Sequence, residues 1–463
     1  MTQGVSADPP ALPPGFLVDP RHTRGDRSGR FPPPFLRFPW YMALANKAGR
    51  LPFVRNHRVF SVEATLLPLF DQVAPGPTFG QAEGTAALRQ LLIDYARAVD
   101  GNPMVTPIGR MLIARMARGH MLNRARTLAF HAGNAAFIAQ NGKIAAPLIV
   151  TGFPRTGTTL LQRLLAEDPL ARAPYTFELE RTTPPRRSGD NPMADPRIAM
   201  SERALARLER AAPGLAARFA QSHPYSPTEP EESLLSMQLH NGLQFLSGPL
   251  AGREYHLALH SPGPAATALL AYERQVLTMM HAWLPAPSHW TLKAPAYAPL
   301  IGDLFSAYPD ARVVLTHRHP GRNFASVCRL LETSVLPFVR PGSFDKWRFA
   351  AFLTETMAPF LTAPMAWRAA NPDKAGQLLD VDYQSLVADP IATVRRIYAH
   401  YSLDYTPAFE ARMQAWLSAN PQGRAGRHAY SNAEYVIDVE ALAERFAPYY
   451  ARQGYKAEPQ AAD

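Results

Sequence analysis

Pro147-Leu-Ile-Val-Thr-Gly-Phe-Pro-Arg-Thr-Gly-Thr-Thr-Leu-Leu-Gln-Arg-Leu-Leu-Ala-Glu-Asp-Pro169 is the stretch of sequence that decides the fold. Its apolar run ends at Gly152 and a helical pattern begins near Thr158, which predicts a strand, a glycine turn and a helix. Gly152 and Gly157 have the Gly-x₄-Gly spacing of a phosphate-binding loop. Glycine permits such a turn, and the amides at a helix N-terminus point at an anion. We therefore expect a phosphate to bind to this loop.

The loop lacks the lysine of nucleoside triphosphatases. Thr158 stands where those enzymes place the lysine that reaches the β- and γ-phosphates, which argues against an ATPase or a kinase. The cation lies instead within the loop, at Arg155. The candidate phosphate-binding residues are thus Arg155, Thr156, Gly157, Thr158 and Thr159.

Three more short apolar runs, at residues 290–292, 313–316 and 378–381, are each followed by a helical stretch. This alternation predicts an α/β fold of the P-loop type, with a parallel sheet covered by helices. A long insertion at about 185–288 has helical patterns near 198–221, 230–247 and 265–284, which Pro-rich joints separate.

The rest of the chain divides by composition. We expect a flexible Pro-rich arm at 1–37, a helical segment at 38–140, the α/β domain at 141–455 and a short tail at 456–463. The only cysteine is Cys328, so an intramolecular disulfide and a cysteine-cluster zinc site are excluded. Without a signal peptide or a long apolar run, we expect a cytoplasmic protein.

A net charge of +10 suits a polyanionic ligand, nucleic acid or an anionic membrane face. Basic composition alone is equally expected of an ordinary globular protein. Arginines at 110–126 are spaced to face a membrane or an acidic partner, although a solvated helix face explains them as well. His317 and His319 have no evident third ligand, so we expect no metal site.

The stretch from Pro147 to Pro169 resembles the 5′-phosphosulfate loop of sulfotransferases, in the form with Arg before Thr-Gly-Thr-Thr. The resemblance implies 3′-phosphoadenosine 5′-phosphosulfate (PAPS) as sulfuryl donor and no metal. It also accounts for the missing lysine, because PAPS has no γ-phosphate.

A second segment, Tyr308-Pro-Asp-Ala-Arg-Val-Val-Leu-Thr-His-Arg318-His-Pro-Gly-Arg-Asn-Phe-Ala-Ser326, is similar to the family's 3′-phosphate segment. The similarity implies that Arg318 and Ser326 bind this phosphate. A guanidinium at a strand end and a hydroxyl two turns into the next helix can converge on one dianion. A third, looser likeness at 420–431 implies Arg427, Tyr430 and Ser431 as nucleotide contacts, and a plain surface loop explains that stretch equally well.

The resemblance also suggests the catalytic groups. Arg155 and Lys293, the latter in a Lys-x-Pro segment, would stabilise charge on the transferring group. Glu178 in Phe-Glu matches the family's base, with Glu180 as the fallback. Glu231 and Glu232 resemble a recurring acidic pair without an assigned role, which the helix dipole explains at least as well.

We therefore predict a sulfotransferase that moves a sulfuryl group from PAPS to a hydroxyl or amine. The acceptor would be a small molecule, a glycan or a lipid. We expect no nucleic-acid partner, and peripheral contact with a membrane is compatible with the sequence. The alternatives are a noncatalytic nucleotide-binding protein of the same fold and, less favoured, a nucleotide-dependent kinase. Neither the acceptor nor the oligomeric state is indicated by the sequence.

Overall fold

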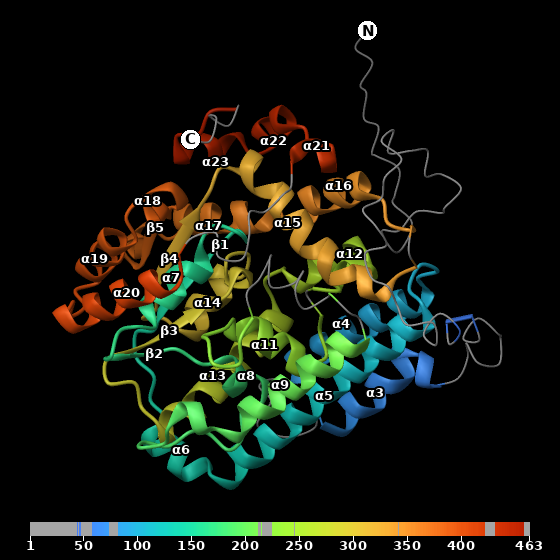
Figure 1. The fold of residues 1–463 in the computed structure, drawn as a ribbon, viewed down its shortest axis with the longest axis horizontal. Helices are drawn as coiled ribbons and strands as arrows, with labels where there is room; N and C mark the ends of the chain where they lie inside the picture. The colour runs from blue at the N-terminus through green and yellow to red at the C-terminus, as the bar shows by residue number, and fades with distance from the viewer. Residues whose placement is uncertain are drawn as a thin grey trace.

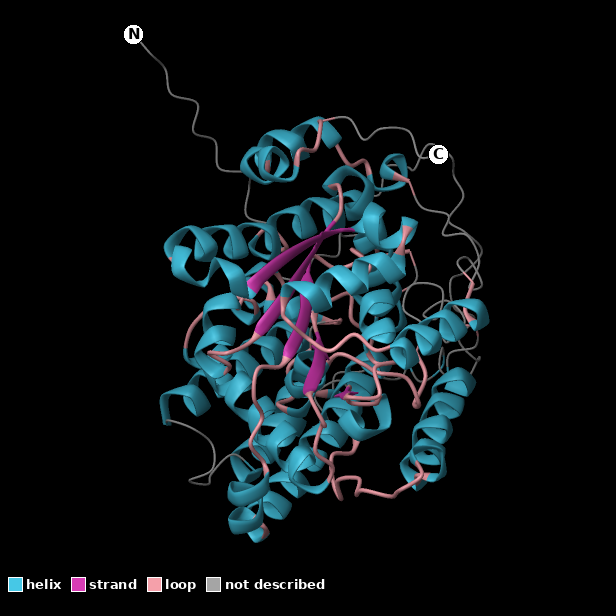
Figure 2. Ribbon diagram, turned by 90° about the vertical axis from the view of Figure 1, so that its left-hand side faces the viewer, coloured by secondary structure: helices cyan, strands magenta, loops and turns pink. Residues whose placement is uncertain are grey.

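In the computed structural model, a sheet of five parallel strands lies at the centre of the described part of the chain (Figures 1 and 2). The strands are β1 (Leu148–Gly152), β2 (Ala171–Arg172), β3 (His289–Lys293), β4 (Arg312–His317) and β5 (Leu378–Asp382), in the order β2-β3-β1-β4-β5. The structure describes residues 44, 46–47, 58–73, 82–211, 214, 225–244, 246–340, 342–421 and 431–457.

The central strand β1 is hydrogen-bonded to β3 on one side and to β4 on the other. In this register Val150 lies beside Lys293, and Gly152 lies beside Thr316. All five residues of β1 are buried, as expected for a parallel strand covered on both faces. The carboxyl ends of the three strands therefore meet at one edge, where ligands bind in open α/β sheets.

Side chains of β1 alternate between two hydrophobic clusters. Leu148 and Val150 pack on one face with α7 (Thr158–Leu165), α18 (Tyr383–Ala388), α19 (Pro390–His400) and α20 (Pro407–Ala419). Ile149 belongs to the larger cluster on the other face, which extends into the N-terminal helices. Of these, α3 (Val62–Val73) and α4 (Ala82–Gly101) lie on the right of Figure 1, away from α18–α20 on the left. The larger cluster therefore joins the N-terminal helices to the sheet.

The other α-helices are those of the N-terminal region, the insertion and the C-terminal half. They are α3 (Val62–Val73), α4 (Ala82–Gly101), α5 (Pro107–Gly133), α6 (Ala135–Asn141), α8 (Thr176–Glu180), α9 (Pro196–Ala211), α11 (Ser233–His240), α12 (Arg253–Leu259), α13 (Pro264–Trp283), α14 (Ile301–Ala307), α15 (Pro320–Val335), α16 (Lys346–Thr356), α17 (Pro359–Ala370), α21 (Asn432–Tyr435), α22 (Val439–Arg445) and α23 (Ala447–Gln453). Within the described ranges, no helix has the length and apolar character needed to cross a membrane.

The predicted fold class is confirmed, with its parallel sheet and helical N-terminal region. The two-residue strand β2 was missed, and α11 is shorter than predicted. This helix ends at His240, because Gly242 follows in the left-handed region at φ 76°. The domain boundaries stay predictions, and the arm at 1–37 lies outside the described residues.

Two positions of the phosphate-binding loop require glycine. Gly152 has φ 140°, and a Cβ there would lie 2.4 Å from the carbonyl oxygen of Thr316. Gly157 has φ 88°, and a Cβ there would lie 2.9 Å from Leu386 Cδ2. The loop thus packs against β4 on one side and α18 on the other, with no room for a side chain at either glycine.

We expect Gly157→Ala to lower the free energy of unfolding by about 1–3 kcal/mol, because it adds both backbone strain and overpacking. Gly376→Ala is the matched control, since a Cβ at Gly376 meets nothing within 4 Å. That control should change stability by less than about 0.5 kcal/mol. Denaturant unfolding of both variants tests the prediction, and an equal effect would show that the loop can relax around alanine.

Candidate functional site

The loop between β1 and α7 is held by a hydrogen bond within the loop and by hydrogen bonds to β4 and α15. Thr156 Oγ1 donates to the carbonyl oxygen of Phe153 at 2.6 Å and lies 2.6 Å from Thr316 Oγ1 on β4. Asn323 Nδ2 on α15 donates to the carbonyl oxygen of Pro154 at 2.9 Å. The Thr156 side chain therefore shapes the loop, although the sequence suggested it only as a phosphate ligand.

The start of α7 supplies the amides that the sequence predicted. Gly157 is its N-cap, and Thr158 and Thr159 are its first two residues. The first N–H groups of a helix have no partner within the helix, and the helix dipole favours an anion there. The geometry of this end of α7 therefore suits a phosphate or sulfate group.

Arg155, Ser326 and Arg318 are brought together at the loop. Arg155 Nε donates to Ser326 Oγ at 3.1 Å, and Arg318 Nη1 donates to the carbonyl oxygen of Arg155 at 3.2 Å. Arg155 itself has φ 69°, an uncommon conformation for a residue with a side chain. The two segments that were matched separately to a 5′- and a 3′-phosphate are thus in direct contact.

The guanidinium of Arg318 has capacity for a further acceptor. Its carbon lies 4.3 Å from the ring centre of Tyr383, the first residue of α18. Its Nε is buried without a hydrogen-bond partner in the described part of the chain. A buried donor left unpaired is unfavourable, and a phosphate oxygen would form a strong charge-assisted bond with it. Arg318 therefore fits the proposed phosphate.

A network that sequence reasoning missed supports the end of β4. His317 contacts Asp380 Oδ1 at 2.9 Å and Tyr449 Oη at 3.0 Å, while Arg368 donates two hydrogen bonds to Asp380. Burial alone would raise the pKa of Asp380, but the hydrogen bonds from His317 and Arg368 lower it to about 2. Because His317 directly precedes Arg318, this network restricts where the Arg318 side chain begins.

Lys293 lies at the end of β3 and is fully buried. Its Nζ donates to Glu232 Oε1 at 2.8 Å and lies 3.5 Å from Glu231 Oε1. Gln162 on α7 donates to the carbonyl oxygen of Glu231 at 3.1 Å. The acidic pair, which the sequence left without a role, is thus joined both to Lys293 and to the helix of the phosphate loop.

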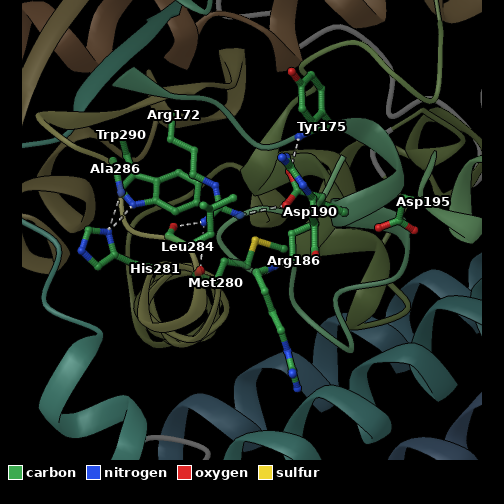
Figure 3. A network of polar contacts seen from close by, with 12 residues as sticks. Arg172, Tyr175, Arg186, Asp190, Asp195, Met280, His281, Leu284, Ala286 and Trp290 are labelled. Carbon is green, nitrogen blue, oxygen red and sulfur yellow. Dashed lines mark hydrogen bonds and ion pairs between the residues drawn. The ribbon is translucent and has the colours of Figure 1, made fainter. Parts of the chain in front are cut away.

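Glu178 lies in a different network, which Figure 3 shows around Arg172, Tyr175 and Arg186. Its carboxylate accepts a hydrogen bond from Arg172 at 2.8 Å and another from the Tyr175 amide at 3.1 Å, and Arg186 lies 3.6 Å away. Arg172 also stacks 4.5 Å from the ring centre of Trp290. In the described residues, the Glu178 carboxylate contacts these three groups and not Lys293. The predicted role as base therefore gains no support from its contacts.

Glu180 and Ser431 make contacts of their own, and two further candidates are not described. Glu180 accepts hydrogen bonds from Ser201 and Tyr225. Ser431 caps α21, where it accepts from the Glu434 amide at 3.2 Å. Arg427 and Tyr430 lie outside the described residues. No group of three or more His, Cys, Asp or Glu side chains is placed to hold a metal in the ranges that are described.

The chain is similar to known sulfotransferases. The model of a family described as the sulfotransferase family matches residues 147–407. The crystal structure of sulfotransferase STF9 from Mycobacterium avium superposes with a TM-score of 0.72 at 23% identity, covering 86% of this chain and 97% of that one. The crystal structure of sulfotransferase STF1 from Mycobacterium tuberculosis H37Rv superposes with a TM-score of 0.64 at 25% identity, covering 84% of this chain and 98% of that one. No curated protein matches the sequence.

The contacts of Glu178 predict a structural effect. We expect Glu178→Gln to lower the free energy of unfolding by about 3–5 kcal/mol, because it leaves the buried Arg172 without its counter-charge. Glu355→Gln, in the exposed pair with Arg253, should change stability by less than about 1 kcal/mol. Chemical denaturation of both variants measures the difference. A mild effect at Glu178 would mean that its ion pairs contribute little to stability.

Proposed function

The chain belongs to the sulfotransferase family, and on that premise we propose that it transfers a sulfuryl group from PAPS to a hydroxyl or amine of an acceptor. The observation that carries the proposal is the contact of Arg155 with Ser326 and Arg318 at the phosphate loop. This contact joins an anion-binding helix start to a second cationic group, as a nucleotide with phosphates at both its 5′ and 3′ positions requires.

Each end of PAPS would have its own ligands. The amides of residues 155–159 and the Arg155 side chain would hold the 5′-phosphosulfate. Ser326 and Arg318, whose Nε is buried without a partner in the described part of the chain, would hold the 3′-phosphate. ATP has a triphosphate and no 3′-phosphate, and the loop lacks the lysine that a triphosphate needs. The kinase alternative is therefore disfavoured.

In the transfer step, the acceptor oxygen or nitrogen would attack sulfur as the bond from sulfur to the 5′-phosphate oxygen breaks. The products would be the sulfated acceptor and adenosine 3′,5′-bisphosphate. Lys293 and Arg155 would stabilise the charge that develops on the transferring group and the leaving oxygen. A base within hydrogen-bond reach would take the acceptor proton.

We propose that Glu232, rather than Glu178, accepts that proton. Glu231 lies beside Glu232 in sequence and is the next candidate. Glu232 is 2.8 Å from Lys293, which would face the sulfuryl group. Both Glu178 oxygens, in contrast, accept hydrogen bonds within the network of Arg172 and Tyr175. A buried Lys293 with two carboxylates also favours an enzyme over a noncatalytic binding protein, since binding a dianion needs no acidic group there.

Donor binding gives the first functional prediction. Adenosine 3′,5′-bisphosphate should raise the melting temperature without magnesium, and at a hundred times its Kd it should add about 2.7 kcal/mol of stability. Arg318→Ala should weaken this binding roughly 10- to 100-fold, because a charge-assisted contact is lost. ATP with magnesium is the control nucleotide. Stabilisation by ATP but not by the bisphosphate would overturn the assignment of the donor.

The choice of base gives the second functional prediction. Radiolabelled transfer from PAPS into a cell extract identifies an acceptor, whose turnover at saturating PAPS is then compared among variants. Glu232→Gln should lower turnover by roughly 10²–10⁴-fold, the range for a positioned base, and leave bisphosphate affinity nearly unchanged. Glu178→Gln, assayed below its melting temperature, should retain most turnover. If turnover falls in Glu178→Gln and not in Glu232→Gln, Glu178 is the base. If turnover falls only in Glu231→Gln, Glu231 is the base.

A further inference from the structure

Glu273 on α13 is a carboxyl group without exposure to solvent and outside the site described above. The described part of the chain offers it hydroxyl partners rather than a cation. Tyr297 donates to its Oε1 at 2.5 Å, and Tyr308 donates to its Oε2 at 3.4 Å. Burial raises the pKa of Glu273 to about 7, although hydrogen bonds from Tyr297, Ser233 and Tyr308 oppose the rise. Such a group is expensive to bury and needs an explanation.

One hydroxyl partner belongs to the segment of Lys293. Tyr297 is fully buried in the short 3₁₀ turn Pro295–Tyr297, four residues after Lys293. The same segment is attached to β1, where Thr151 Oγ1 donates to the carbonyl oxygen of Ala294 at 2.8 Å. The bond from Tyr297 to Glu273 therefore fixes the last residue of the turn that follows Lys293.

The same cluster reaches the segment of Glu232. Ser233, the residue after Glu232, begins α11 and is fully buried. Its Oγ lies 2.7 Å from Tyr297 Oη, and it is also a hydrogen-bond partner of Glu273. The segments that carry Lys293 and Glu232 are thus joined twice, once through their own ion pair and once through Ser233, Tyr297 and Glu273.

We propose that Glu273 is a positioning residue, which holds Lys293 and Glu232 in register through Tyr297 and Ser233. The inference rests on the proposed function, because it supposes that the ion pair acts on the acceptor and the sulfuryl group. A misplacement of about 1 Å at a catalytic group can lower turnover roughly 100-fold, so a rigid connection behind the pair has a catalytic effect. The Glu273 carboxylate provides such a connection, because it accepts from Tyr297 and is also a hydrogen-bond partner of Ser233.

Tyr308 provides the control. It donates to the same carboxylate but follows α14, and it contacts neither Ser233 nor the turn after Lys293 in the described hydrogen bonds. Tyr297→Phe and Tyr308→Phe each remove one hydroxyl from Glu273 with little change in shape. Only Tyr297→Phe separates the carboxylate from the segment of Lys293 and removes the bond between Tyr297 and Ser233, whereas either variant would weaken the core.

The experiment measures kcat, bisphosphate affinity and amide hydrogen exchange for the two variants. Tyr297→Phe should lower kcat roughly ten-fold or more, with the Kd for adenosine 3′,5′-bisphosphate within about two-fold of the parent. Exchange should quicken at residues 228–235 and 291–299. Tyr308→Phe should leave kcat within about two-fold and exchange at 228–235 unchanged. Equal losses in both variants, or none in Tyr297→Phe, would overturn the inference.

A second pair of variants serves if Tyr297→Phe folds poorly. Glu273→Gln keeps a carbonyl acceptor for Tyr297, whereas Glu273→Leu keeps only similar bulk. The inference requires higher kcat in Glu273→Gln than in Glu273→Leu at equal folded fraction, and equal values would contradict it. If the parent protein transfers nothing from PAPS, the proposed function fails. The exchange comparison then decides separately whether Glu273 connects the two segments, because it needs no substrate.

Discussion

The pairing of β1 with β3 on one side and β4 on the other is the constraint on which the site depends. This register places the loop after β1, Lys293 at the end of β3 and Arg318 after β4 at one edge of the sheet. None of these residues is near another in sequence. If β3 or β4 were shifted along β1 by one residue, Lys293 or Arg318 would move by about 3.3 Å. A displacement of that size would break the hydrogen bonds of either side chain, because donor–acceptor distances vary by only about 0.5 Å.

Three glutamates, of which Glu178 and Glu273 are buried and Glu232 is half-buried, have different roles because their partners differ. Glu178 is compensated by arginines, so it stabilises the joint between α8 and the sheet. Glu232 and Glu231 both contact Lys293, a cation at the end of a strand. Glu273 has only hydroxyl partners in the described residues. Proton transfer suits the second arrangement best, since the first is neutralised and the third lies behind the turn that follows Lys293.

The sequence predicted what local patterns determine. Four apolar runs indicated four of the strands, and the glycine spacing located the loop whose Gly157 has φ 88°. The choice between Glu178 and Glu232 depends instead on a long-range contact, that of Lys293 with Glu232, which no local spacing encodes. Glu178 is also the third residue of α8 and accepts from the amide of the N-cap residue Tyr175, as the Glu of a capping box does. The family likeness and the helix cap therefore give the same local signature.

The contacts at the phosphate loop also bear on how the donor would be selected. Arg155 Nε donates to the neutral hydroxyl of Ser326, and Arg318 Nη1 donates to a backbone carbonyl. In both bonds only the donor is charged, so a phosphate oxygen, which is itself negatively charged, would form stronger bonds with the same guanidinium groups. A dianion between Arg318 and Ser326 would thus replace weaker bonds by stronger ones and satisfy Arg318 Nε. A ligand with a plain 3′-hydroxyl would gain neither of these. If PAPS is the donor, Arg318 and Ser326, which lie outside the phosphate loop, would therefore add to its discrimination from ATP.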